Sequence, residues 1–136
     1  MTVSTSTNSS SAVRWSEAVW FITGASTGFG HHIAATVLAR GGRVIATARD
    51  ATSLADLVAL APERARAMAL DVRDAAAVRA AAREALACFG GVDVLVNNAG
   101  HGLVASVEET DDDAMLAVID VNFMGTARVT RALLPG

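Results

Sequence analysis

The sequence predicts an α/β fold built on a doubly wound parallel sheet, which ends after about four strands and the long helix that follows them. Short apolar runs alternate with helix-like stretches along the chain, as they do in βαβ units. The runs are apolar on both faces, as strands of a buried parallel sheet are. We expect right-handed crossovers and the strand order 3-2-1-4. Ligands of such sheets bind where the order reverses, at the carboxyl ends of the strands.

The first half of the chain supplies three strands and two helices. An apolar run opens the fold, and from Phe29 the apolar spacing becomes helical until two glycines follow Arg40. A second apolar run comes next, and Pro62 closes a short helix before the third. The expected elements are strand 18–22, helix 29–40, strand 43–48, helix 53–60 and strand 66–70.

The second half begins with an alanine-rich helix. Asp74 suits its N-cap, and the glycines at 90 and 91 suit its end. The spacing Ser106-x-x-Glu109 predicts a capping box, and three aspartates at 111–113 suit the positive end of the last helix better than they suit a metal site. The expected elements are helix 74–89, strand 92–96, a short turn at 106–109 and helix 112–134.

Composition excludes several classes of function. The 136 residues suffice for one compact domain, and 52% hydrophobic with 18% charged residues is a globular composition. The net charge of −3 and the lack of a basic cluster argue against a nucleic-acid surface. No apolar run approaches the length of a membrane span, and the single Cys88 has no disulfide partner. We expect no metal site, since the adjacent His31 and His32 point to different faces of a helix.

Residues 1–16 are rich in serine and threonine and contain no apolar signal region. We interpret them as a disordered tail, with the folded domain spanning residues 17–136. A cytoplasmic location follows by default.

The loop TGASTGFG, residues 23–30, joins the first strand to the first helix. Glycines permit a tight turn, and the N-terminus of the following helix offers free N–H groups and a positive dipole end. Such a loop suits a pyrophosphate, although a tight turn without a ligand stays open on this motif alone. The Gly-Lys-Ser/Thr of a nucleoside-triphosphate loop is missing, and the spacing differs from G-x-G-x-x-G.

The spacing Gly24-xxx-Gly28-x-Gly30 after Thr23 resembles the TGxxxGxG motif of the short-chain dehydrogenase/reductase family, whose cofactor domain is Rossmann-like. Asp71-Val72 is similar to the family's pair at the adenine, and residues 97–100 are similar to its NNAG motif. Asn122 matches the helix asparagine of the family's catalytic tetrad. The resemblance runs from Ala18 to the end of the chain, about the first half of a full-length member.

The resemblance implies an oxidoreductase that moves hydride between a nicotinamide cofactor and an alcohol/carbonyl carbon. Asn122 would be the catalytic residue present. The resemblance also implies a set of cofactor-binding residues, in which we include Arg49 for the reason given in the next paragraph. The set is Thr23, Gly24, Ser26, Gly28, Phe29, Gly30, Arg49, Asp71, Val72, Asn97, Ala99 and Gly100.

The end of the second strand carries the choice of cofactor. Members that prefer NAD(H) place an acid there, whereas this chain has Ala48 followed by Arg49. A guanidinium suits the 2′-phosphate of NADP(H), so we expect NADP(H) over NAD(H). Asp50 leaves an alternative open, because a shift in the loop would bring its carboxylate toward the ribose.

The family's serine and its Tyr-xxx-Lys pair are not matched, and the 136 residues contain no tyrosine and no lysine. We therefore expect the chain alone to be inactive, as the cofactor-binding N-terminal part of an oxidoreductase cut short after the last helix. A non-catalytic NADP(H)-binding module or sensor is the alternative, and a partner that completes its sheet on another chain is a third. In relatives the last helix also builds a dimer interface, so self-association is a further expectation.

Overall fold

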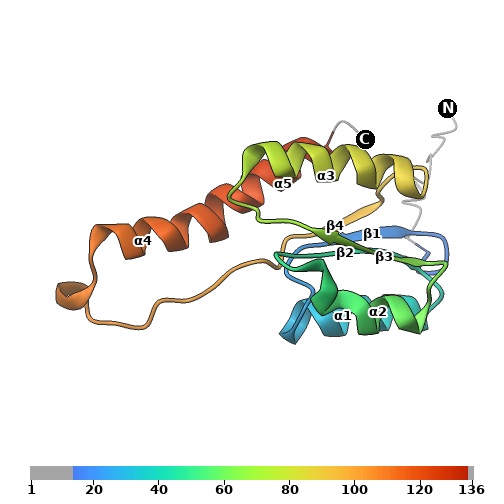
Figure 1. Cartoon of the computed structure of the whole chain (residues 1–136), viewed down its shortest axis with the longest axis horizontal. Coiled ribbons are helices and arrows are strands. Elements are labelled where there is room, and N and C mark those ends of the chain that lie inside the picture. Colours follow the sequence, from blue (N-terminus) through green and yellow to red (C-terminus); the bar gives the residue numbers. More distant parts are fainter. Residues whose placement is uncertain (1–13, 135–136) are drawn as a thin grey trace, which may run out of the picture.

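The computed structural model describes residues 14–134, and its core is a single parallel sheet (Figure 1). The strands run in the order β3-β2-β1-β4, so the predicted fold class and strand order are confirmed. Phe21 pairs with Ile45 on one side and with Leu95 on the other. Most of the predicted 1–16 tail lies outside the described residues. The strands are β1 (Val19–Ile22), β2 (Arg43–Ala48), β3 (Ala65–Ala69) and β4 (Val94–Val96).

Helices cover both faces of the sheet (Figure 1). Helices α1 (Gly28–Ala39) and α2 (Ala55–Leu60) lie on one face, and α3 (Ala75–Cys88) and α5 (Thr126–Leu133) lie on the other. Neighbouring strand residues point to opposite faces, so Ile22 packs in the cluster with α1 and α2 while Phe21 packs in the cluster with α3 and α5. Both side chains are at most 1% exposed.

Aspartate side chains cap three helix starts, among them that of α3. The Asp74 carboxylate accepts hydrogen bonds from the amides of Ala76 and Ala77 at 2.9 and 3.0 Å, as the sequence predicts. The predicted capping box at Ser106 is wrong. The Ser106 side chain bonds no amide of the short η2 (Val107–Glu109), and its hydroxyl instead donates to the Glu109 carboxylate at 3.2 Å.

The last helix is not the uniform α-helix that the sequence predicts over 112–134. A π-helical segment, η3 (Asp120–Gly125), separates α4 (Asp112–Ile119) from α5. The chain passes close to the loop after β3 there, since a Cβ added at Gly125 would lie 2.6 Å from Val72 Cγ2. The wider turn therefore ends at a residue that must lack a side chain.

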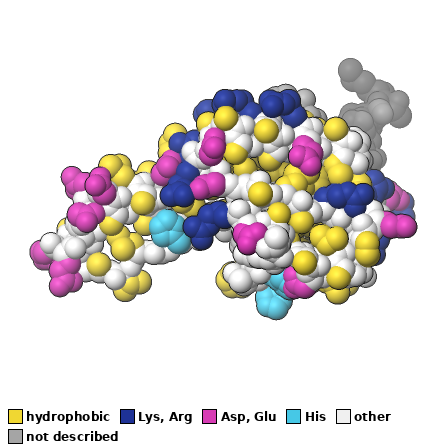
Figure 2. Space-filling view, in the orientation of Figure 1, with side chains coloured by type: hydrophobic (Ala, Val, Ile, Leu, Met, Phe, Trp, Pro, Cys, Tyr) yellow, Lys and Arg dark blue, Asp and Glu magenta, His cyan; other side chains and the backbone are white. Residues whose placement is uncertain are grey.

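Helix α4 and the loop before it form an arm that extends beyond the sheet (Figures 1 and 2). We call residues 103–123 the arm. Its apolar side chains are exposed, with Leu116 at 59% and Phe123 at 68%, whereas Val129 and Leu133 of α5 are buried. Within residues 14–134 no helix is long and apolar enough to cross a membrane, and no group of three metal-ligating side chains occurs.

Candidate functional site

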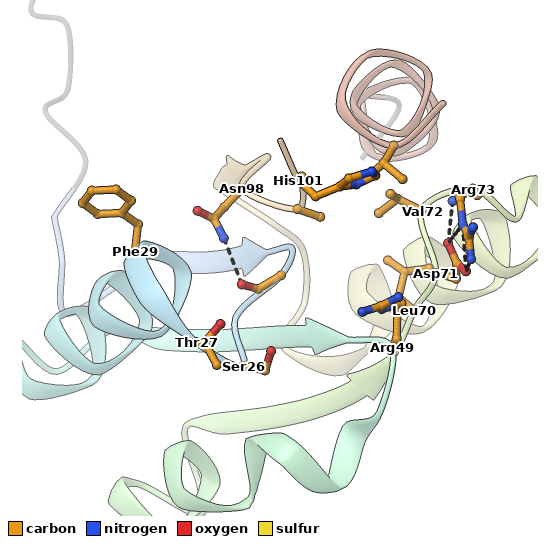
Figure 3. A pocket seen from close by; sticks show the side chains of 14 residues that line it. Ser26, Thr27, Phe29, Arg49, Leu70, Asp71, Val72, Arg73, Asn98 and His101 are labelled. Carbon is orange, nitrogen blue, oxygen red and sulfur yellow. Dashed lines mark hydrogen bonds and ion pairs between the residues drawn. The ribbon is translucent and has the colours of Figure 1, made fainter. Parts of the chain in front are cut away.

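A cavity of about 610 Å³ opens at the carboxyl ends of the strands, where the strand order reverses (Figure 3). Four loops contribute to it, one after each strand. This placement agrees with the position that the sequence predicts for a ligand site. The lining residues are Gly24, Ser26, Thr27, Phe29, Arg49, Leu70, Asp71, Val72, Arg73, Asn98, Ala99, Gly100, His101 and Val121.

Two glycines of the β1–α1 loop adopt left-handed backbone angles, with φ of 64° at Gly24 and 60° at Gly28. A Cβ at Gly24 would also lie 2.8 Å from Ala99 Cα, so the loop after β4 leaves no room for a side chain there. Gly28 has open space instead, with no atom within 4 Å of the position a Cβ would take. The backbone is therefore bare at the point where a ligand would approach.

The N-terminus of α1 is suited to an anion. Its N-cap, Thr27, makes no side-chain hydrogen bond to the first-turn amides. Ser26 and Thr27 line the cavity beside these amides (Figure 3), and Phe29 is 84% exposed. Free amides and the positive dipole end of a 12-residue helix fit the pyrophosphate of a dinucleotide.

A hydrogen-bonded clamp joins the loop after β1 to the loop after β4. The Thr23 hydroxyl, which is buried, accepts from the amides of Asn98 and Ala99 at 3.0 and 2.9 Å. The Asn98 side-chain amide donates to the carbonyls of Thr23 and Gly24 at 3.1 and 2.9 Å. Gly30 lies against this amide, and a Cβ there would collide with it. Thr23 and Gly30 therefore shape the cavity without lining it, and Asn98 is a site residue that sequence reasoning left out.

Arg49 and Asp50 take opposite directions at the end of β2. Arg49 lines the cavity and forms no ion pair within residues 14–134. Asp50 turns to the start of η1 (Ala51–Leu54), where its carboxylate accepts from the Thr52 amide at 2.9 Å and the Thr52 hydroxyl at 2.7 Å. These hydrogen bonds lower the pKa of Asp50, with the hydroxyl contributing most. The carboxylate that could have approached the ribose is thus used as a cap.

Asp71 lies in the cavity wall and is bound by Arg73, which the sequence analysis did not single out (Figure 3). Arg73 Nη2 donates to Asp71 Oδ2 at 2.6 Å, and Nε donates to Oδ1 and Oδ2 at 3.0 and 3.1 Å. Hydrogen bonds from Arg73 lower the pKa of Asp71 from 3.8 to about 2. The spacing of Asp71 and Arg73, an acid two residues before an arginine, could have suggested this ion pair from the sequence. The same spacing is common on exposed loops, so it does not predict one.

Asn97 and Asn122 do not line the cavity. The Asn97 side chain donates to the Thr130 hydroxyl at 3.0 Å, beside α5. The Asn122 side-chain amide makes two hydrogen bonds to the backbone of His101, the residue after the NNAG motif. Its oxygen accepts from His101 N at 3.0 Å, and its nitrogen donates to His101 O at 2.8 Å. A Cβ at Gly100 would lie 2.9 Å from the same oxygen. Asn122 therefore fixes the loop that carries His101 into the cavity.

Comparison with known proteins identifies the family. The sequence profile of the short chain dehydrogenase family matches residues 18–136. Oxidoreductase BOA17 of Botryotinia fuckeliana is 43% identical over 118 residues, which are 86% of this chain and 43% of the relative. Human 17-beta-hydroxysteroid dehydrogenase type 1 is 41% identical over 126 residues, which are 86% of this chain and 38% of the relative.

Solved structures agree with the sequence comparison. A short-chain dehydrogenase from Streptomyces avermitilis superimposes with a TM-score of 0.84 at 48% identity, covering 87% of this chain and 44% of that one. A 3-ketoacyl-(acyl-carrier-protein) reductase from Brucella melitensis, solved with NADH, gives 0.84 at 34% identity, covering 89% and 50%. The chain thus spans half or less of the length of these relatives and corresponds to their N-terminal part. It belongs to the short-chain dehydrogenase/reductase family, whose members use NAD(H) or NADP(H).

Proposed function

We propose that residues 17–136 form the NADP(H)-binding part of an oxidoreductase that acts on an alcohol/carbonyl pair. Three features of the cavity support dinucleotide binding. The glycine backbone is bare at Gly28, the first-turn amides of α1 are uncapped by side chains, and Thr23 and Asn98 hold the two loops together. Gly24, Ser26 and Phe29 would face the pyrophosphate, and Asp71 and Val72 would face the adenine.

The preference for NADP(H) rests on one observation at the end of β2. Arg49 is the cavity's unpaired cation among the described residues, while the Asp50 carboxylate is occupied as the cap of η1. A free carboxylate there would repel a 2′-phosphate and bind the ribose hydroxyls of NAD(H). A free guanidinium instead offers charge-assisted hydrogen bonds to the phosphate. We therefore assign the 2′-phosphate to Arg49.

The chemistry would be hydride transfer, which the nicotinamide supplies when it is bound. Relatives with this fold include proteins named as a dehydrogenase of 17-beta-hydroxysteroids and a reductase of 3-ketoacyl groups, and both names fit an alcohol/carbonyl pair. Within this chain, Asn122 would support catalysis by fixing the backbone at His101, beside the cavity. The 136 residues contain no tyrosine and no lysine for proton exchange, so we expect them to bind cofactor without turnover.

The test is a calorimetric titration of the purified chain with NADPH and with NADH. We expect NADPH to bind at least about tenfold more tightly, since a charge-assisted pair contributes about 1.5–3 kcal/mol. Arg49→Ala should remove that difference and leave NADH binding within about twofold. Arg79→Ala is the matched control, because Arg79 is an exposed arginine of α3 outside the cavity lining.

Equal or tighter binding of NADH by the wild-type chain would contradict the preference for NADP(H), and no binding of either would contradict the proposed function. The alternative of a non-catalytic sensor shares the binding prediction. The two hypotheses make different predictions for a fusion of this chain to the C-terminal part of a relative, such as the Streptomyces avermitilis dehydrogenase. The enzyme hypothesis expects alcohol-dependent NADPH formation from that fusion, and the sensor hypothesis expects none.

A further inference from the structure

Two of the three charged side chains that line the cavity form an ion pair with each other. The charged lining residues are Arg49, Asp71 and Arg73. Arg73 holds both oxygens of the Asp71 carboxylate through its Nε and Nη2 atoms, at 2.6–3.1 Å, and the backbone amide of Arg73 adds a hydrogen bond to Oδ1 at 3.0 Å. Asp71 is therefore neutralised by one partner in a bidentate arrangement.

Arg49 lines the same cavity as Asp71 and forms no ion pair of its own within residues 14–134, so its guanidinium is available to compete for that carboxylate. The charge of Arg49 also lowers the pKa of Asp71, after the larger effect of Arg73. Figure 3 shows the Arg49 side chain on the opposite side of Asp71 from Arg73. Without Arg73, the remaining cation whose charge acts on the Asp71 carboxylate would be Arg49, the guanidinium assigned above to the 2′-phosphate.

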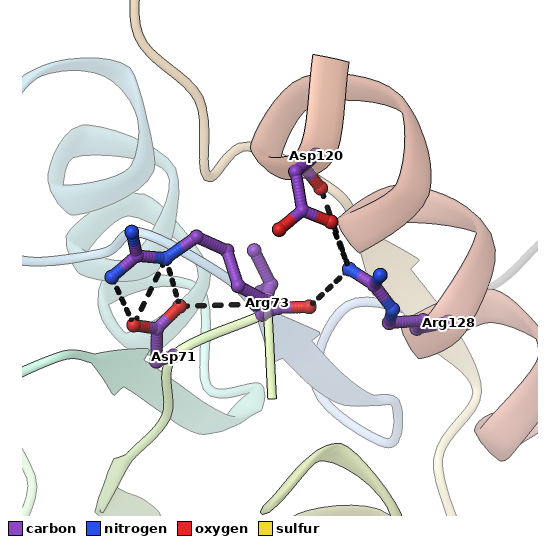
Figure 4. Close-up of polar contacts among 5 residues, drawn as sticks. Asp71, Arg73, Asp120 and Arg128 are labelled. Atoms are coloured by element: carbon purple, nitrogen blue, oxygen red, sulfur yellow. Dashed lines mark hydrogen bonds and ion pairs between the residues drawn. The ribbon is translucent and has the colours of Figure 1, made fainter. Parts of the chain in front are cut away.

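The surrounding charges favour the pairing of Arg73 with Asp71 over a pairing with another carboxylate. The other carboxylate that acts on Arg73 is Asp120, and the Arg128 guanidinium already binds Asp120 at 2.7 Å (Figure 4). Arg128 also donates to the carbonyl of Val72 at 3.4 Å. Two ion pairs thus lie side by side at the end of β3, Asp71 with Arg73 and Asp120 with Arg128, and they leave Arg49 as the uncompensated charge of the wall.

We infer that Arg73 is a positioning residue for NADP(H) selectivity: it occupies the Asp71 carboxylate and so keeps the Arg49 guanidinium free for the 2′-phosphate. The inference rests on the proposed function, because it assumes that the adenosine end of a dinucleotide binds in this cavity. It assigns to Arg73 an indirect effect, through Asp71, on a group that Arg49 contacts.

The test uses adenosine 2′,5′-bisphosphate and AMP, which differ by the 2′-phosphate and need only the adenosine side of the cavity. Their affinities for the full chain are measured by calorimetry at low ionic strength. In Arg73→Gln the freed carboxylate should pair with Arg49, and the bisphosphate should bind about fivefold more weakly. AMP affinity should change by less than about twofold, so the ratio of the two affinities falls.

The double variant Asp71→Asn/Arg73→Gln decides whether Arg73 acts through Asp71. It removes the competing carboxylate as well, so the ratio of affinities should return to within about twofold of the wild type. Arg79→Gln serves as the matched control and should leave the ratio unchanged. Circular dichroism melting shows that each variant is folded.

The outcomes separate the two proposals. If Arg73→Gln weakens both ligands equally, or if the double variant does not restore the ratio, the inference about Arg73 is wrong while cofactor binding stands. If the wild-type chain binds neither ligand, the proposed function fails and the inference fails with it.

Discussion

Asn97 and Asn98 are neighbours of the same type, yet their amides serve different parts of the molecule. Asn98 donates to the carbonyls of Thr23 and Gly24 across the cavity, whereas Asn97 donates to the Thr130 hydroxyl beside α5. Alternation along an extended chain sends adjacent side chains to opposite sides. The pair therefore offers a comparison between an amide that joins the two loops of the cavity and one that does not.

We predict that Asn98→Ala weakens NADPH binding at least tenfold and lowers the free energy of unfolding by about 1–3 kcal/mol. The substitution removes two hydrogen bonds and leaves two loop carbonyls without their partner. Asn97→Ala removes a single hydrogen bond, and that bond is exposed. It should lower the free energy of unfolding by less than about 1 kcal/mol and leave the NADPH affinity within twofold of the wild type. Urea denaturation and NADPH titration measure both. Equal effects of the two variants on binding would contradict the clamp.

Asp71 gives a prediction in pH. Arg73 holds its pKa at about 2 in the folded chain, below the usual 3.8. The ionised carboxylate therefore stabilises the fold above pH 3.8, and this contribution is lost as the pH falls through 2. Because Asp71 is about one-third exposed, screening reduces the contribution to about 1 kcal/mol or less at neutral pH.

A carbon-detected NMR titration of the Asp71 carboxyl group measures this directly. We expect a midpoint near pH 2 in the wild type and, in Arg73→Gln, a higher midpoint that still lies below 3.8, because Arg49 then pairs with the carboxylate. Arg79→Gln should leave the midpoint where it is. A wild-type midpoint near 3.8 would show that the Asp71–Arg73 ion pair does not persist in solution.

Among the elements, the caps of α3 and η2 look alike in sequence and differ in the fold. The Asp74 side chain satisfies two first-turn amides of α3, while the Ser106 side chain satisfies none in η2. We predict that Asp74→Ala lowers the free energy of unfolding by about 1 kcal/mol. Ser106→Ala should change it by less than about 0.5 kcal/mol. Chemical denaturation followed by circular dichroism compares them, and a larger loss for Ser106→Ala would reverse this assignment of the caps.

The regular elements could be predicted because local sequence determines them. The run 43–48 forms a strand with the predicted bounds, and α3 begins directly after the Asp74 cap. The π-helical turn of η3 could not be predicted, because the residue against which it packs lies in a distant part of the chain. Gly125 has to pass Val72, and the helical spacing of residues 112–134 carries no sign of that contact.

The same distinction holds for the site. Motif spacing predicted the glycine loop, Arg49 and Asp71, which the fold brings to one cavity. The spacing could not show that Asp50 would cap η1 or that Arg73 would bind Asp71, because both depend on side-chain directions in loops. Asn97 illustrates the opposite case, since its motif predicts a role at the cofactor while its side chain contacts Thr130.

At the scale of the whole molecule, the arm sets how the chain behaves in solution. Figure 2 shows hydrophobic and acidic side chains together on this projection. Its exposed apolar residues include Leu116, Ile119 and Phe123, each at least 50% exposed. Strand β4 adds to the same tendency, since within residues 14–134 it pairs with β1 alone and has no strand on its other edge. Apolar surface on a helix and a free strand edge both favour association with another chain.

We therefore predict that the chain self-associates as its concentration rises, through the apolar surface of the arm. Sedimentation equilibrium between about 5 and 200 μM should show a rising average mass. The double variant Leu116→Asp/Phe123→Asp should shift the association to at least tenfold higher concentration, because burying two carboxylates in an apolar contact is unfavourable. Leu60→Asp is the matched control, since Leu60 is 62% exposed on α2 and lies outside the arm.

If Leu60→Asp lowers the average mass as much as the arm variant does, association is a general effect of exposed apolar groups. If neither variant changes the mass while a proline in β4 does, the strand edge carries the contact and the arm does not.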